Sequence, residues 1–238
     1  MTWRTEHLAE GVTLYCGDCR EILPTLRGVD AVVSDPPYGI GFVRGAGGKG
    51  IGGNKYVTKF VGVAVAGDDA DFNPAPVLSV ADKVLLWGGN HFADRLPASS
   101  GWLVWDKRAA SHHSNDFADC EIAWTNLSIV GRIFRHHWDG MMKASERGVA
   151  RVHPTQKPVA VMSWCIERIP PPATVICDPY MGSGTTGIAA VKLKRKFIGV
   201  EIEPRYFDIA CRRISEALKQ PDMFVAPAAP APKQEAML

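Results

Sequence analysis

The 238-residue chain contains no uninterrupted apolar run of the roughly 18 residues that a membrane-spanning helix needs. Its first residues lead directly into polar sequence, so no cleavable signal is visible. Six cysteines do not make a disulfide framework in a chain of this size. A formal net charge of +2 gives no general attraction to nucleic acid, and no internal repeat is evident. These absences exclude a membrane protein and a disulfide-rich secreted protein, and they predict a cytoplasmic chain.

Metal binding is also poorly supported by the sequence. Cys16 and Cys19 form a C-x-x-C pair, but no second pair follows at the spacing of a zinc site. The adjacent histidines at 112–113 and 136–137 are more typical of loops than of metal ligands. We therefore expect no metal ion.

The tetrapeptide Asp35-Pro36-Pro37-Tyr38 follows the apolar run 29–33, which predicts a short buried parallel strand. Two prolines prevent both a helix and further strand pairing, so the chain must turn outward there. Ligands in open α/β sheets bind outside the carboxyl ends of the strands. The tetrapeptide is therefore a candidate catalytic loop.

The residue types in this loop suit a planar base that carries an exocyclic amine. Asp35 and the carbonyl of Pro36 can accept the two amine hydrogens, which frees the nitrogen lone pair from conjugation with the ring. Tyr38 can stack on a flipped base, a contact that contributes roughly 1–3 kcal/mol. The alternative is a rigid exit from the strand, with Tyr38 packing locally.

A second motif lies near the other end of the chain. Residues 173–177 predict a strand, 178–187 a glycine-rich turn, 188–194 a helix and 197–201 another strand. Gly182, Gly184 and Gly187 have the G-x-G-x-x-G spacing, and Glu201 stands where an acid accepts ribose hydroxyls. The absence of a Lys-Ser or Lys-Thr after the glycines argues against a phosphate-binding P-loop. A nicotinamide-dependent oxidoreductase remains an alternative.

Three motifs together resemble the β-class DNA amino methyltransferases. The segment Asp178-Pro179-Tyr180-Met181-Gly182-Ser183-Gly184-Thr185-Thr186 is similar to their S-adenosylmethionine loop, and Asp35-Pro36-Pro37-Tyr38 resembles their catalytic loop. Between them, His153-Pro154-Thr155-Gln156-Lys157-Pro158 resembles a third signature of the family. The order is the circularly permuted one that defines the class, and the motifs bracket the chain up to about residue 219.

The resemblance implies a Rossmann-like α/β fold, with a mostly parallel seven-stranded sheet and helices on both faces. It also implies S-adenosylmethionine as cofactor. The residues that would bind the cofactor are Asp18, Thr155, Lys157, Asp178, Pro179, Gly182, Ser183, Gly184, Thr185, Thr186 and Glu201. Lys157 has a physical case of its own, because an ammonium can make a charge-assisted hydrogen bond to the cofactor carboxylate. The alternative is an ordinary solvated lysine in the first turn of a helix running to residue 169.

Length and composition fit a single α/β domain over residues 1–219, since 46% of the residues are apolar and no break in composition divides the chain. Further strands are predicted at 83–87, 102–105 and 121–124, with Trp124 in the core. Residues 203–219 have the spacing of an amphipathic helix. The Pro/Ala-rich residues 220–238 predict a disordered tail.

Two basic segments are candidates for DNA contact. Residues 43–60 form a glycine-rich loop with Arg44, Lys49, Lys55 and Lys59 but no acid. The second segment, 130–151, lies within a short target-recognition insert expected at about 107–151, and it includes Arg132, Arg135 and Lys143. A solvated basic face is the alternative for this second segment.

These motifs favour an S-adenosylmethionine-dependent methyltransferase of double-stranded DNA, bacterial or phage-encoded, as in restriction-modification. Adenine N6 is preferred over cytosine N4 as the acceptor, because the family associates an aspartate at position 35 mainly with adenine. An RNA or protein amine methyltransferase and a non-catalytic DNA-binding module are further alternatives. A homodimer and a partner nuclease stay open.

Overall fold

The computed structural model describes residues 3–42, 63–108, 118–138 and 143–220. Nine strands in these residues form one sheet, in the order β1-β2-β9-β8-β3-β4-β6-β5-β7. The central strands β2 (Val12–Cys16), β9 (Lys196–Glu201), β8 (Val175–Asp178), β3 (Ala31–Ser34) and β4 (Lys83–Trp87) are mutually parallel. The predicted Rossmann-like α/β class is confirmed.

The predicted number of seven strands is wrong for this chain. At one edge, β1 (Arg4–Ala9) pairs antiparallel with β2. At the other, β6 (Cys120–Thr125) runs antiparallel between β4 and β5 (Gly101–Asp106), and β7 (Arg132–Arg135) adds a parallel strand to β5. The additional strands are β1 and β7, two edge strands whose mixed polar and apolar residues lack the apolar run of a central strand.

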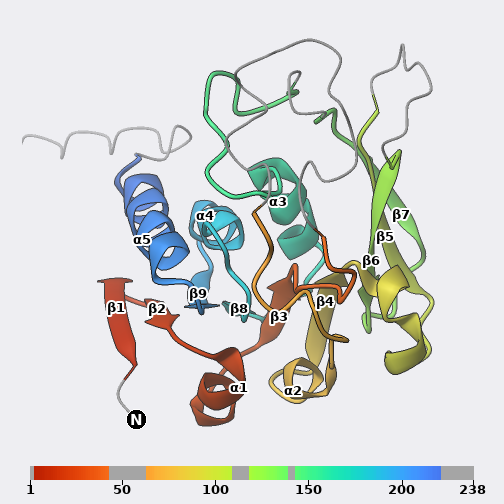
Figure 1. Ribbon diagram of the computed structural model, residues 1–238, viewed down its shortest axis with the longest axis horizontal. Helices are drawn as coiled ribbons and strands as arrows, with labels where there is room; N and C mark the ends of the chain where they lie inside the picture. The colour runs from red at the N-terminus through yellow and green to blue at the C-terminus, as the bar shows by residue number, and fades with distance from the viewer. Residues whose placement is uncertain (1–2, 43–62, 109–117, 139–142, 221–238) are drawn as a thin grey trace, which may run out of the picture.

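Helices cover both faces of the sheet (Figure 1). On one face lie α3 (Val159–Glu167), α4 (Thr185–Lys192) and α5 (Pro204–Lys219), and on the other lie the short helices α1 (Cys19–Ile22) and α2 (Ala75–Leu78). None of the described helices is long and apolar enough to cross a bilayer. The strongly amphipathic α5 begins at Pro204, which fits the first turn of a helix.

The central strands divide their side chains between two cores. Val33 and Leu85 belong to the cluster beneath α3, α4 and α5, whereas Val32, Val84 and Leu86 belong to the cluster on the face of α1 and α2. Successive side chains of a strand point to opposite faces, so a strand buried on both faces must be apolar throughout. This explains the continuous apolar runs of β3 and β4.

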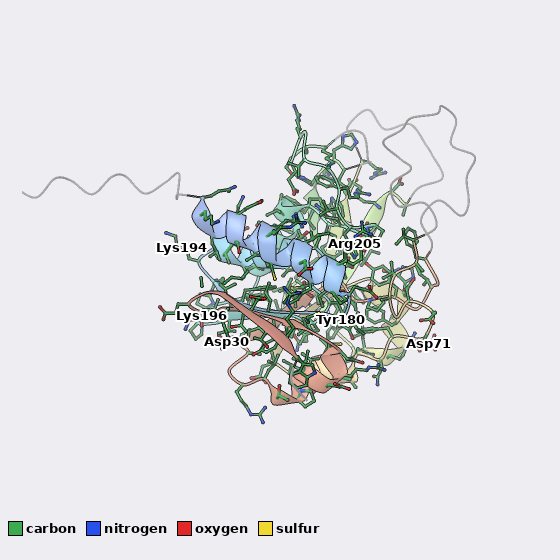
Figure 2. All side chains as sticks on the ribbon, turned by 60° about the vertical axis from the view of Figure 1, so that its left-hand side comes forward. Asp30, Asp71, Tyr180, Lys194, Lys196 and Arg205 are labelled. Carbon is green, nitrogen blue, oxygen red and sulfur yellow. The ribbon has the colours of Figure 1, made fainter. Side chains whose placement is uncertain are left out.

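The order in which the chain adds strands to the sheet reverses between β3 and β8, which are parallel neighbours. From β8 the chain passes through α4 to β9 on one side, and from β3 it passes through α2 to β4 on the other. The loops after β3 and β8 therefore diverge, and ligands in open α/β sheets bind at such a reversal. Figure 2 shows Asp30 and Lys196 at the amino ends of the strands and Tyr180 at the carboxyl ends.

Candidate active site

The loops after β3 and β8 are joined by a buried aspartate. Asp178 at the end of β8 accepts hydrogen bonds from Ser34 Oγ (2.6 Å) at the end of β3 and from Thr186 Oγ1 (2.5 Å) at the start of α4. Its Oδ1 also accepts from the backbone N–H of Tyr180 (3.1 Å). Burial raises the pKa of Asp178 to about 6. The predicted catalytic loop begins at Asp35, directly after Ser34. The hydrogen bond from Ser34 to Asp178 therefore joins this loop to the predicted cofactor loop.

The glycine-rich loop is held by Glu201 at the end of β9. The Oε2 atom of Glu201 accepts from the backbone N–H of Gly182 (2.8 Å), and Oε1 accepts from the N–H of Glu203 (2.9 Å). Burial raises the pKa of Glu201 to about 7. A carboxylate has about four acceptor positions, so Glu201 keeps capacity for hydroxyl donors while it holds the loop.

The glycines of this loop have different surroundings. Gly182 has a φ of +52°, and a Cβ there would lie no closer than 3.5 Å to the His153 ring. Gly184 has a φ of +80°, but a Cβ there would lie 3.0 Å from the Cβ of Ala210 on α5. At Gly187 an added Cβ would collide with Ile214 and Phe197. Gly184 and Gly187 therefore allow close packing of α4, while the surface of the loop at Gly182 stays open.

Arg213 of α5 supports the loop from outside and was not anticipated from the sequence. Its Nη1 donates to the carbonyl (2.6 Å) and Oγ (2.8 Å) of Ser183 and lies 3.5 Å from Thr185 Oγ1. The signal was its position three residues after Ala210, on the buried stripe of the helix. A basic residue on an apolar stripe indicates a polar partner.

The tetrapeptide loop is shaped by a second buried acid that the sequence analysis also missed. Asp68 is only 4% exposed and accepts hydrogen bonds from the backbone N–H groups of Tyr38 (2.7 Å), Gly39 (2.8 Å) and Phe42 (2.6 Å). These bonds satisfy the donors of a turn that cannot pair with the sheet. Asp68 therefore fixes the path of the chain immediately after Pro37.

Tyr38 lies against its own loop and against the loop after β4. Its hydroxyl donates to Asp35 Oδ1 (2.5 Å), and its ring stacks on His91, with centroids 5.0 Å apart and planes 13° apart. Gly88 has a φ of +72°, and a Cβ there would overlap the Tyr38 ring. Local packing of Tyr38, which was the alternative to base stacking, is therefore present. The ring is half-buried, and its use as a stacking surface stays a prediction.

Lys157 lies between two carboxylates. Its Nζ is 2.7 Å from Asp35 Oδ2 and 2.9 Å from Glu121 Oε2 on β6, and it donates to the Tyr38 hydroxyl at 3.3 Å. Lys107, just after β5, pairs with the other oxygen of Glu121 at 3.1 Å. The side chain of Lys157 is 6% exposed, so the solvated alternative is wrong. Contact with a cofactor carboxylate would require Lys157 to share or release one of these ion pairs.

Burial and charge oppose each other in this cluster. Burial raises the pKa of Asp35 despite the nearby Lys157 ammonium, and the Glu121 charge raises it further. Burial alone would also raise the pKa of Glu121, but Lys157 and Lys107 more than offset it and hold that pKa at about 2. Burial lowers the pKa of Lys157, yet Asp35 and Glu121 raise it well above its usual value. Asp35 is therefore the acid that protonates first.

Three more predicted cofactor residues lie near this edge. Asp18 follows β2, caps α1 through the N–H of Arg20 (2.8 Å) and pairs with the Arg20 guanidinium (2.5 Å). Pro179 is buried directly after Asp178. Thr155 contacts Nδ1 of His153 through its N–H (3.3 Å) and its hydroxyl (3.2 Å). Burial lowers the pKa of His153 to about 4, so its ring is neutral near pH 7.

The predicted DNA contacts are not gathered into one group. Arg44, Lys49 and Lys55 lie outside the described residues. Arg132 and Arg135 are exposed on β7, but an odd separation along a strand places them on opposite faces of the sheet.

Lys143 donates to the carbonyl of Val149 (2.7 Å) and lies over the Trp138 ring, 4.7 Å from its centroid. Its contacts are therefore local.

Comparison with known proteins shows similarity in sequence over part of the chain. Residues 102–212 match the family described as DNA methylase, which covers N6 and N4 methyltransferases. Type II methyltransferase M2.DpnII of Streptococcus pneumoniae is 37% identical over 147 residues, which is 60% of this chain and 47% of that protein. Type II methyltransferase M2.LlaDCHI of Lactococcus lactis subsp. cremoris is 37% identical over 86 residues, 36% of this chain and 32% of that protein. The chain thus matches about half or less of the length of these relatives.

Solved structures agree in fold. The M1.HpyAVI–SAM complex superposes with a TM-score of 0.53 at 22% identity, over 84% of this chain and 98% of that one. The cytosine-N4-specific PvuII DNA methyltransferase gives a TM-score of 0.55 at 14% identity, over 90% of this chain and 88% of that one. At such identities the likeness extends to the fold alone.

Proposed function

We propose that the chain, which is similar to N6/N4 DNA methylases over residues 102–212, transfers a methyl group from S-adenosylmethionine to an exocyclic amine of DNA. One observation carries the proposal: Ser34, beside Asp35, donates a hydrogen bond to Asp178 at the start of the glycine-rich loop. An acceptor for an amine and a loop for a nucleoside cofactor therefore lie at the same reversal of the sheet.

On the acceptor side, Asp35 and the carbonyl of Pro36 hold the two hydrogens of the target amine. This hydrogen bonding draws the amine out of conjugation, so its lone pair becomes available. Asp35 already accepts from Tyr38 and Lys157, and a carboxylate can take further donors. A flipped base stacks on or beside Tyr38, whose ring position is fixed by His91.

On the cofactor side, the described residues fit a nucleoside that carries an amino acid. The open surface at Gly182 lets a ligand approach the backbone, and Glu201 has a raised pKa because its two accepted hydrogen bonds do not offset its burial. Ribose hydroxyls would supply the missing donors. Asp178 and the loop from Gly182 to Thr186 would hold the methionine part, with Asp18 and Thr155 beside it. When bound, S-adenosylmethionine supplies a methyl group activated by a positively charged sulfur.

The nicotinamide alternative makes a different binding prediction. S-adenosylmethionine should bind with a heat that calorimetry can measure, and a nicotinamide dinucleotide should not compete with it. Tight dinucleotide binding without S-adenosylmethionine binding would overturn the proposal. An RNA or protein substrate is distinguished by offering each substrate class with labelled cofactor.

Adenine N6 is the proposed acceptor atom. A purine offers more area than a pyrimidine for stacking, and a carboxylate is a strong acceptor for the less nucleophilic amine. Digestion of methylated double-stranded DNA to nucleosides, followed by mass spectrometry, identifies the product. N4-methylcytosine as sole product would overturn the choice of base but leave the role of Asp35 unchanged.

Cofactor affinity should depend on the ionisation of Glu201. Its pKa in the folded protein, about 7, lies above the usual value of 4.5, so the charged acceptor is complete only above pH 7. Because ribose hydroxyls bind the carboxylate better than the acid, affinity should fall by up to about tenfold per pH unit below 7. Calorimetric titrations at pH 5.5, 6.5 and 7.5 measure this dependence.

Glu201→Gln should bind more weakly and lose most of the pH dependence between pH 6.5 and 7.5, whereas Asp178, whose pKa is about 6, still titrates below that range. Glu203→Gln is the matched control, because Glu203 contributes its backbone N–H to the site and keeps it after substitution. If Glu201→Gln retained the wild-type pH dependence, the ribose contact would be assigned to the wrong group.

DNA affinity should depend on Arg135 more than on Arg132. β7 is parallel to β5, and Arg135 lies opposite Asp106 at the carboxyl end of that strand, the edge that carries the site. Arg132 is three residues back, roughly 10 Å away along the strand. If Arg135 contacts a phosphate, Arg135→Gln should shallow the slope of log K against log salt by about 0.9.

Arg132→Gln is the control, with equal charge loss on the same strand. The slopes are measured by fluorescence anisotropy from 50 to 300 mM salt. Equal slopes for Arg135→Gln and the wild type would make this segment a solvated basic face.

A further inference from the structure

The ion-pair cluster around Asp35 extends well beyond the tetrapeptide. Lys157 comes from the segment before α3, Glu121 from β6 and Lys107 from the residue just after β5, so three further segments join the Asp35 loop in one cluster. Charges alternate along the cluster: Asp35, Lys157, Glu121, Lys107. The Lys157 ammonium also lies 5.2 Å from the centroid of the buried Trp87 ring.

Stability alone is a poor reason for such a cluster. Desolvation of buried charges costs several kcal/mol per ion, and apolar side chains of similar volume often stabilise a core as well or better. Glu121 is on β6, a strand that also carries the buried apolar side chains Ala123 and Trp124. Lys157 contacts Asp35, the acid proposed to hold the amine, and Glu121 contacts Lys157.

We propose that Glu121 is a positioning residue of the methyl-acceptor site, which acts on Asp35 through the shared Lys157 ammonium. The inference rests on the proposed function, since it concerns the acceptor strength of Asp35. Glu121 takes part of the hydrogen-bonding capacity and charge of Lys157. Asp35 is therefore a stronger hydrogen-bond acceptor for the target amine than it would be as the only carboxylate paired with Lys157.

The direction of the effect follows from the charges. Without the Glu121 charge, Lys157 and Lys107 would face Asp35 alone, and the pKa of Asp35 would fall. Without Lys107, the Glu121 charge would be less compensated, and the pKa of Asp35 would rise. In the described part of the chain, the other titratable groups that interact with the cluster are Tyr38 on the same loop, Asp178 from β8 and Cys165 from α3. None of them changes in these two variants.

Two variants with opposite expected shifts test the inference. In Glu121→Gln the acid limb of the pH–kcat profile should move down by about one pH unit, with kcat at pH 8 reduced roughly tenfold and the KM for DNA little changed. In Lys107→Gln the acid limb should move up. S-adenosylmethionine affinity should stay within about twofold of wild type in both variants.

Asp119→Asn is the matched control, since Asp119 lies two residues before Glu121 and pairs with Arg108 (3.4 Å). Glu121→Asp keeps the charge and should leave the acid limb at its wild-type position. A purely structural role for Glu121 would lower the melting temperature without moving the limb. Limbs that coincide in wild type, Glu121→Gln and Lys107→Gln overturn the inference.

A second measurement needs no methyl transfer. Between pH 4 and 8, a carboxyl whose folded pKa is raised weakens the fold as pH rises through its titration, because the folded state binds the proton more tightly. Glu121 itself, with a pKa of about 2, does not titrate in this range. Asp178 and Glu201, with pKa values of about 6 and 7, titrate in this range in both proteins, so the test compares the two pH profiles of thermal unfolding. The contribution of Asp35 should lie at lower pH in Glu121→Gln than in wild type.

The two measurements separate two failures. Absence of wild-type transfer to DNA would defeat the proposed function, and the unfolding profile would still decide whether Glu121 controls Asp35. An unfolding transition at the same pH in both proteins overturns the inference even if the enzyme is active. Should Glu121→Gln fail to fold, the upward shift expected for Lys107→Gln carries the test, and its absence has the same consequence.

Discussion

Asp35→Asn is expected to lower methyl transfer to DNA by roughly 10³-fold or more while S-adenosylmethionine affinity stays within a few-fold of wild type. The substitution keeps the shape of the side chain but replaces one carboxylate oxygen by an amide donor, which opposes an amine hydrogen instead of accepting it. The cofactor residues are affected little, because the link between the two loops runs through Ser34 and Asp178. Transfer of tritiated methyl groups and calorimetry with the cofactor measure the two quantities separately.

Asp69→Asn is the matched control. Asp69 is exposed and directly follows Asp68, which holds the tetrapeptide turn, so the control removes a charge near the loop without touching the cluster. If Asp35→Asn reduced cofactor affinity and methyl transfer by the same factor, Asp35 would belong to the cofactor site. If transfer were unchanged, another group would hold the amine.

The inner strands of the sheet were predictable because each of them carries apolar side chains that are buried on one or both faces. The runs at 83–87, 102–105, 121–124 and 197–201 all correspond to strands, and the predicted helix at 203–219 differs from α5 by one residue. Trp124 is 1% exposed, as predicted for a core side chain. Apolar periodicity is a local signal, so it identifies elements whose neighbours are all apolar.

The supports of the site were not predictable in the same way. Glu121 is 36 positions from Lys157, and Asp68 is 30 positions from Tyr38, so their contacts depend on strand order and not on any local pattern. Lys157 was expected in the first turn of a helix. Pro158 instead precedes the first residue of α3, and a residue before proline is disfavoured from helical conformation. Lys157 is therefore in an extended segment that reaches into the interior.

The glycine-rich loop illustrates a related limit of motif spacing. The G-x-G-x-x-G pattern implies that each glycine serves close approach, either to a ligand or within the fold. In the structure, Gly187 and Gly184 face α5, and only Gly182 has an open surface. Glycine is therefore required at these three positions for different physical reasons. Substitutions at Gly182 and Gly184 can distinguish the reasons.

Gly184→Asp is expected to destabilise the whole fold and not only the cofactor site. A φ of +80° costs a residue with a Cβ roughly 1–2 kcal/mol, and a side chain 3.0 Å from Ala210 adds about 1–3 kcal/mol of overpacking against α5. For a domain of this size, a loss of about 3 kcal/mol lowers the melting temperature by roughly 6–12 °C. Thermal unfolding without cofactor measures the effect, and weaker cofactor binding follows from the displaced loop.

Gly182→Ala is the matched comparison on the same loop. Its φ of +52° carries a similar backbone cost of roughly 1–2 kcal/mol, but its methyl group would meet no atom closer than 3.5 Å. The melting temperature should therefore fall much less than in Gly184→Asp, while cofactor affinity drops because the methyl group covers the open backbone. An unchanged melting temperature in Gly184→Asp together with lost cofactor binding would contradict this assignment. Gly184 would then be a ligand-contacting residue, and its packing against Ala210 would be incidental.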